Sequence, residues 1–325
     1  MVLVVILATV ALGCAVLAPL AEGRAPVALG FNAGDLTVHP DGAIERFRSE
    51  AGVQPKIAMY YQDWNPNWST ALVDPNVVDP IYARGVVPMI SWTPFRTTHD
   101  LRDQPDYRLS RIVAGAFDPY IRRAAAEAAA LEKPLLINLA PEMNGSWFSY
   151  GAGVHGNTPH EFILMWRHVV RIFRRAGADD VRWVWSPNIY GHNTVHPFAP
   201  FYPGDAWVDL AGLDGYNWGR SPRTIWQGFV DLFAGSYAAL VHLSGKPVIV
   251  SETASAERGG SKANWIGGMR HAVEKRMRRI RAIVWFDRRK ERDWRIDSSP
   301  GSLAAFRGMA SAPLFTGTLQ TLLGP

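Results

Sequence analysis

Two glutamates that each stand at the end of a short apolar run are the strongest chemical signal in this sequence. Glu142 follows the run over residues 135–140 and precedes a cluster of aromatic residues that begins at Trp147. Glu252 lies at the end of a second apolar run, over residues 246–253. Two facing carboxyl groups can hydrolyse a glycosidic bond, because one protonates the leaving oxygen while the other attacks or stabilises the anomeric carbon. Either glutamate alone could equally be a surface carboxylate in an ion pair, and only a fold that brings them together favours catalysis.

The elements that must position these glutamates follow one repeated pattern, in which an apolar run, a polar or aromatic loop and an amphipathic helix succeed one another. Strands are predicted over residues 27–31, 56–61, 86–92, 134–140, 182–188, 208–213, 246–253 and 282–287. Continuous apolar strands alternating with helices predict a parallel sheet covered on both faces. Eight such units without a linker predict an α/β fold, a single-domain (β/α)8 TIM barrel over residues 24–325. The active site of that fold lies at the carboxyl ends of the strands.

Helical spacing and capping residues predict the intervening helices. Asp118 followed by proline, and Thr158 followed by proline, are typical helix starts. The predicted helices cover residues 42–51, 76–84, 120–132, a long segment from residue 159, 223–243, 262–279 and 302–309. The apolar positions of the long segment, Trp166 among them, recur at helical spacing and predict core packing.

The first residues of the chain have the composition of a targeting segment. Residues 1–23 form an apolar run that ends in small residues, which predicts a secretory signal peptide or an N-terminal anchor. We therefore expect a secreted or cell-surface protein, associated with a membrane only if this segment is retained. Cys14, the only cysteine, lies within it, so removal would leave no disulfide, thiol nucleophile or cysteine metal site. We expect a monomer.

Charge and motif content argue against other classes of partner. The net charge is +5, from 34 Lys and Arg against 29 Asp and Glu. The densest basic segment, residues 275–281, is typical of a solvated helix end rather than of a nucleic-acid surface. No glycine-rich phosphate loop or dinucleotide motif follows a predicted strand. The histidines lack the spacing of a helical zinc site. We therefore expect no metal, no cofactor and no nucleic acid, and a β-linked polysaccharide as the partner.

Four segments carry a family resemblance. Residues 141–148 read PEMNGSWF and resemble the HEMNGxWF motif of glycoside hydrolase family 26, which contains the β-mannanases. Residues 246–253 read KPVIVSET and resemble the family's segment around the catalytic nucleophile. Residues 185–188 and 209–217 are similar to its fifth and sixth strands. The resemblance extends over most of residues 27–310.

The resemblance implies a retaining double displacement without a cofactor. Glu142 would act first as general acid and then as general base, and Glu252 would be the nucleophile. Tyr216 matches a tyrosine that hydrogen-bonds the nucleophile. Trp285 matches an aromatic platform under the sugar beside the scissile bond. Asn144 would orient Glu142 or contact a sugar hydroxyl, with a purely turn-forming role as the alternative.

The 13 tryptophans provide further candidates for an aromatic substrate groove. The resemblance and the strand-end positions favour Trp92, Trp147 and Trp218. Trp64 is a weaker candidate, for which core packing is an equal alternative.

One departure from the family pattern concerns the substrate. Pro141 stands where the mannanases carry histidine, and Asn138 and Leu139 occupy the upstream segment where they carry Arg-Pro. An endo-β-1,4-mannanase is the first expectation. Mixed-linkage β-glucan, β-1,3-xylan and a bacterial exopolysaccharide remain alternative substrates. A barrel that binds glycans without cleaving them is the alternative from another class, although pure binding needs no carboxylate pair.

Overall fold

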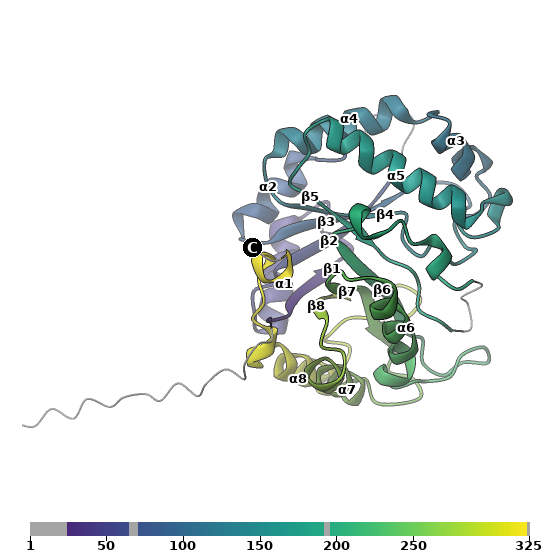
Figure 1. Cartoon of the computed structure of the whole chain (residues 1–325). Helices are drawn as coiled ribbons and strands as arrows, with labels where there is room; N and C mark the ends of the chain where they lie inside the picture. The colour runs from purple at the N-terminus through teal and green to yellow at the C-terminus, as the bar shows by residue number, and fades with distance from the viewer. Residues whose placement is uncertain (1–24, 65–70, 192–195, 324–325) are drawn as a thin grey trace, which may run out of the picture.

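The chain forms a closed barrel of eight parallel strands in chain order, surrounded by helices (Figure 1). The computed structural model describes residues 25–64, 71–191 and 196–323, so the predicted targeting segment 1–23 lies outside the described residues. β1 pairs with both β2 and β8, which closes the barrel. The predicted TIM barrel is thus confirmed. The strands are β1 Ala28–Asn32, β2 Ile57–Asp63, β3 Val87–Thr93, β4 Leu135–Leu139, β5 Val181–Trp185, β6 Leu210–Asn217, β7 Val248–Ser255 and β8 Ile280–Phe286.

Helices cover the outside of the barrel in the described part of the chain. They are α1 Pro40–Ala51, α2 Pro75–Ala83, α3 Leu109–Val113, α4 Asp118–Leu131, α5 Pro159–Arg175, α6 Phe229–Leu243, α7 Lys262–Lys275, α8 Pro300–Ala310 and α9 Leu319–Leu323. The predicted capping residue Thr158 forms a capping box with Glu161 at the start of α5. None of the helices within the described ranges is long and apolar enough to span a bilayer.

Two helix predictions were wrong in detail, and two short helices were missed. The helix predicted from residue 223 begins only at Phe229, because Ser221 and Thr224 pair across a tight turn instead. α7 ends at Lys275, before the predicted residue 279. The short helices α3 and α9 were not predicted.

Side chains on each strand alternate between the barrel interior and the surrounding helices. The interior is filled mainly by the apolar residues Ala28, Ile57, Met59, Met89, Leu136, Val184, Leu210, Ile249, Ala282 and Val284. Near the carboxyl ends the interior positions become polar, as at Asn138, Ser186 and Ser251, all of which are buried. This alternation decides which strand residues can face a substrate.

An irregularity between β6 and β7 helps to orient the second glutamate. The register shifts between Leu213 and Asp214, so that Leu213 pairs with Val250 while Asp214 pairs with Glu252. The extra residue on β7 is Ser251. Such bulges redirect side chains. Ser251 and Glu252 therefore both contribute polar groups to the mouth of the barrel.

Candidate active site

Glu142 lies on a strained turn directly after β4. Ala140 and Glu142 both have left-handed backbone conformations, with φ of 45° and 55°. For non-glycine residues such conformations cost about 1–3 kcal/mol each and occur most often at functional sites. Backbone hydrogen bonds hold the turn: Ala140 N–H donates to the Trp92 carbonyl at 3.0 Å, and Glu142 N–H donates to the Ser186 carbonyl at 2.7 Å. The turn therefore fixes Glu142 against the ends of β3 and β5.

Two donors hold the Glu142 carboxyl group. Asn188 Nδ2 donates to Oε1 at 2.5 Å, and Trp147 Nε1 donates to Oε2 at 2.9 Å. Asn188 is itself fixed by Asn144, whose Oδ1 accepts from Asn188 N–H at 2.8 Å and whose Nδ2 donates to the Asn188 carbonyl at 2.9 Å. Asn144 is fully buried. The structure therefore gives Asn144 an orienting role that acts through Asn188, and the predicted sugar contact is wrong.

Trp147 reaches Glu142 by folding back over a glycine. A Cβ atom on Gly145 would lie 2.3 Å from the Trp147 ring, which is closer than any stable contact. Trp147 is half-buried and packs beside Phe148. The position of Trp147 is consistent with the predicted place in the substrate groove and adds a hydrogen bond to Glu142 that the sequence did not indicate.

Glu252 accepts hydrogen bonds from two tyrosines. The Tyr216 hydroxyl donates to Oε1, and the Tyr61 hydroxyl donates to Oε2. The Tyr216 contact is the one that the family resemblance implies. Tyr61, on β2, was missed in the sequence, although its position two residues after the interior residue Met59 predicts an inward side chain.

The two glutamates have different electrostatic surroundings. Burial and the charge of Glu252 raise the pKa of Glu142 to about 7, against the opposing effect of its two hydrogen-bond donors. Burial also raises the pKa of Glu252, but the hydroxyls of Tyr216 and Tyr61 favour its ionised form. A carboxyl group that is partly protonated near neutral pH beside one that accepts two hydroxyl donors is suited to acid–base and nucleophilic roles.

A third carboxyl group, Asp214, lies beneath the pair. Burial, followed by the charges of Glu252 and Glu142, raises its pKa well above the usual range. Ser251 Oγ donates to Asp214 Oδ1 at 2.5 Å, and Ser186 Oγ lies 2.5 Å from Ser251 Oγ. Burial and the two neighbouring glutamate charges thus outweigh the hydrogen bonds from Ser251 and Ser186, and they disfavour the ionised form of Asp214.

The predictions for Trp285 and Trp92 were wrong. Trp285 is fully buried and faces the helices, where its ring lies 5.9 Å from that of Trp265 on α7 and 5.4 Å from that of Phe306 on α8. Trp92 is also fully buried, and its Nε1 donates to the Tyr120 hydroxyl of α4 at 3.1 Å. Both side chains occupy outward positions of their strands and cannot contact a sugar in the barrel mouth.

Trp64 belongs to the same layer. It is fully buried, with its ring 4.8 Å from that of Trp92, which confirms the alternative of core packing.

Phe286, the residue after Trp285 on β8, is the aromatic residue of that strand that faces the mouth of the barrel. The Phe286 ring lies 5.6 Å from the Tyr216 ring and 6.5 Å from the Tyr61 ring, edge to face in both cases. Trp218 is half-buried, 6.0 Å from Tyr216 and 5.1 Å from Trp294. Phe286 and Trp218 therefore lie on the Glu252 side of the site, and the buried Trp294 packs behind them. Strand alternation is the signal that could have identified Phe286.

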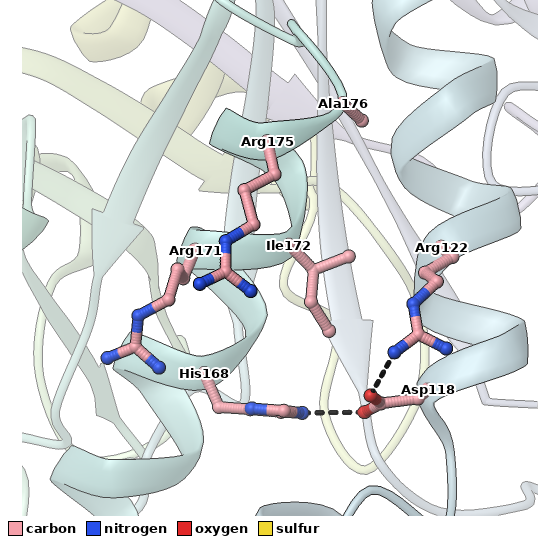
Figure 2. Close-up of a pocket in the computed structure, with 7 residues that line it drawn as sticks. All are labelled: Asp118, Arg122, His168, Arg171, Ile172, Arg175 and Ala176. Carbon is pink, nitrogen blue, oxygen red and sulfur yellow. Dashed lines mark hydrogen bonds and ion pairs between the residues drawn. The ribbon is translucent and has the colours of Figure 1, made fainter.

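A separate cavity of about 310 Å³ lies outside the barrel, between α4 and α5 (Figure 2). Asp118, predicted as a cap, is instead the first residue of α4 and faces this cavity. Its carboxylate accepts from Arg122 at 2.7 Å and lies 2.6 Å from His168 Nε2. Neither Glu142 nor Glu252 lines this cavity. Among the residues that the structure describes, no three His, Cys, Asp or Glu side chains are grouped to hold a metal ion.

Several known proteins similar to this chain have the names of glycan-cleaving enzymes. A model of glycosyl hydrolase family 26 matches residues 88–261. Endoglucanase H of Acetivibrio thermocellus is 36% identical over 271 residues, which are 82% of this chain and 29% of that protein. A mannan endo-1,4-beta-mannosidase of Bacillus subtilis is 30% identical over 126 residues, 37% of this chain and 30% of that protein. The chain thus spans less than a third of the length of either relative.

Solved structures share the fold. A modular endo-beta-1,4-mannanase from Cellulomonas fimi has a TM-score of 0.69 at 20% identity, covering 93% of this chain and 75% of that one. The catalytic domain of an endo-beta-1,4-mannanase from Bacillus sp. JAMB-750 has a TM-score of 0.68 at 18% identity, covering 92% and 89%. With the family model matching more than half of the sequence, the chain belongs to glycosyl hydrolase family 26.

Proposed function

We propose that this chain is a retaining glycoside hydrolase that cleaves a β-linked polysaccharide. The observation that carries the proposal is the contrast between two carboxyl groups at the ends of β4 and β7. Glu142 is held by amide and indole N–H groups with a pKa of about 7, and Glu252 is held by two tyrosine hydroxyls. Membership of the family supports the same assignment.

In the first step, a Glu252 oxygen attacks the anomeric carbon while the bond from that carbon to the leaving oxygen breaks. Glu142 gives its proton to the leaving oxygen, so the products are a glycosyl ester on Glu252 and a free sugar hydroxyl. In the second step, Glu142 removes a proton from water, and the water oxygen attacks the anomeric carbon. The ester bond breaks, Glu252 regains its charge, and the configuration is retained.

The residues around Glu142 suit both halves of this cycle. Because its pKa lies near 7, a substantial fraction is protonated at neutral pH and can act as acid. After proton transfer, the Asn188 and Trp147 donors stabilise the carboxylate, which must then act as base.

β-1,4-Mannan is the first candidate substrate, as the family resemblance implies. The mannan endo-1,4-beta-mannosidase relatives and the mannanase structures support it. A β-glucan is the second candidate, because the match to Endoglucanase H is longer and more identical than the match to the B. subtilis mannosidase. Because Pro141 stands where the mannanases carry histidine, glycans other than mannan should also be tested as substrates.

Reducing-sugar release from mannan, mixed-linkage β-glucan and β-1,3-xylan tests the activity and ranks the substrates. Internal cleavage would appear as a rapid fall in viscosity relative to sugar release. The Glu252→Ala variant should be inactive and partly rescued by azide, which replaces the missing nucleophile. Retention on a polysaccharide gel without release from any β-glycan would support a binding protein instead.

We also propose that the chain acts outside the cytoplasm as a monomer. The apolar composition of residues 1–23 supports export or surface anchoring. Cell fractionation with N-terminal sequencing of the mature chain tests the location, and light scattering tests the oligomeric state.

A further inference from the structure

Tyr61 reaches Glu252, the proposed nucleophile, from a strand that is not adjacent to β7. Glu252 lies on β7 and Tyr216 on the adjacent strand β6, whereas Tyr61 comes from β2. β2 is separated from β7 by β8 and β1 in the closed barrel. The hydrogen bond from Tyr61 to Glu252 Oε2 therefore spans the barrel mouth.

Strand alternation accounts for this position. Ile57 and Met59 fill the barrel interior, so Tyr61 is the next inward residue of β2. Its ring packs edge to face against Phe286 at 6.5 Å. Tyr61 is 36% exposed, so a substrate bound in the mouth can reach it.

Tyr216 and Tyr61 bind different oxygens of the Glu252 carboxylate. Tyr216 donates to Oε1 and Tyr61 donates to Oε2, which fixes the plane of the carboxylate. Each carboxylate oxygen can accept more than one hydrogen bond and so keeps electrons available for attack. Burial and the charge of Glu252 hold the pKa of Tyr61 well above its usual range, so the hydroxyl stays a donor.

We propose that Tyr61 is a second positioning residue for the nucleophile, which fixes Glu252 Oε2 from across the mouth and favours its ionised form. This inference rests on the proposed function. When Glu252 becomes an ester its negative charge is lost, and the hydrogen bond from Tyr61 weakens. The Tyr61 hydroxyl is then free to contact the bound sugar.

Other ionisable groups also act on Glu252. Glu142 after β4 and Asp214 on β6 face it as carboxyl groups. Arg288 and Lys290, on the loop after β8, favour its ionised form by charge. These four groups are unchanged in a Tyr61→Phe variant, so a difference from wild type isolates the lost hydroxyl.

The test compares wild type, Tyr61→Phe and Tyr60→Phe. Tyr60 is the matched control, because it is the preceding residue of β2, is buried, and its hydroxyl has no hydrogen-bond partner among the described residues. We expect Tyr61→Phe to lower kcat about tenfold to a hundredfold, the effect of losing one hydrogen bond to a charged group. The acidic limb of kcat/KM should move to higher pH, while Tyr60→Phe behaves as wild type.

A readout independent of turnover separates this inference from the proposed function. Carbon NMR of protein labelled at the glutamate carboxyl carbons follows the Glu252 titration in each variant. A higher Glu252 midpoint in Tyr61→Phe alone supports the inference, even if wild type cleaves no glycan and the proposed function fails. An unchanged midpoint, or the same change in Tyr60→Phe, overturns it.

Discussion

Replacing Asn188 by alanine should move the basic limb of the pH–rate profile to higher pH. Asn188 Nδ2 donates to Glu142 Oε1 at 2.5 Å and favours the ionised carboxylate. A hydrogen bond to a charged group contributes about 1.5–3 kcal/mol, and one pKa unit corresponds to about 1.4 kcal/mol. Glu142 must be protonated for the first step. We therefore expect the limb to move up by about one to two pH units from its wild-type position near pH 7.

The assay measures kcat/KM between pH 4 and 9 on the best substrate, for wild type and Asn188→Ala. Asn264→Ala, at an exposed position on α7, is the control. On the plateau between the acidic limb, which Glu252 sets, and the basic limb, Glu142 is protonated in every variant, so a lower plateau reports disturbed geometry rather than altered protonation. A basic limb that stays in place or moves to lower pH in Asn188→Ala would refute the role given to this hydrogen bond.

Three further changes give separate predictions. The pKa of Glu142 rises from 4.5 to about 7 on folding, so ionisation of this carboxyl group opposes folding as pH increases. Glu142→Gln should therefore raise the unfolding free energy, measured by urea titration, by up to about 3 kcal/mol at pH 8, and should leave it unchanged at pH 4. Gly145→Ala should displace the Trp147 ring and lower kcat/KM at least tenfold with an unchanged melting temperature, since its Cβ would lie 2.3 Å from that ring. Trp285→Ala should lower the unfolding free energy by about 3–5 kcal/mol without changing KM, whereas Phe286→Ala should raise KM. A raised KM in Trp285→Ala and an unchanged KM in Phe286→Ala would restore Trp285 as the sugar platform.

The barrel and the glutamate pair were predictable because both depend on local patterns. Each apolar strand and amphipathic helix is encoded within a short segment, and the fold then brings the strand ends together. Glu142 and Glu252 follow from their positions at those ends. The start of α6 was missed because the Ser221–Thr224 turn depends on side-chain hydrogen bonds that propensity does not record.

The errors at the site have two physical causes. Trp285 was assigned to the groove from the family resemblance, and Trp92 from the resemblance together with its position at a strand end. Neither assignment considered that side chains on a strand alternate between the two faces. The apolar neighbours of Trp285 could have given the alternation and selected Phe286. Tyr61 instead contacts Glu252 across the barrel mouth, a long-range relation that follows only from closure of the sheet.

Covalent trapping of the intermediate tests the central claim most directly. The best substrate of the glycan screen defines the sugar, and its activated 2-deoxy-2-fluoro glycoside slows the second step so that the ester accumulates. Mass spectrometry of the intact protein and its peptides should show one added glycosyl group, located on Glu252. Hydrolysis of the natural substrate, followed by proton NMR, should release the β-anomer first. A label on another residue, or first release of the α-anomer, would contradict the retaining mechanism proposed for Glu142 and Glu252.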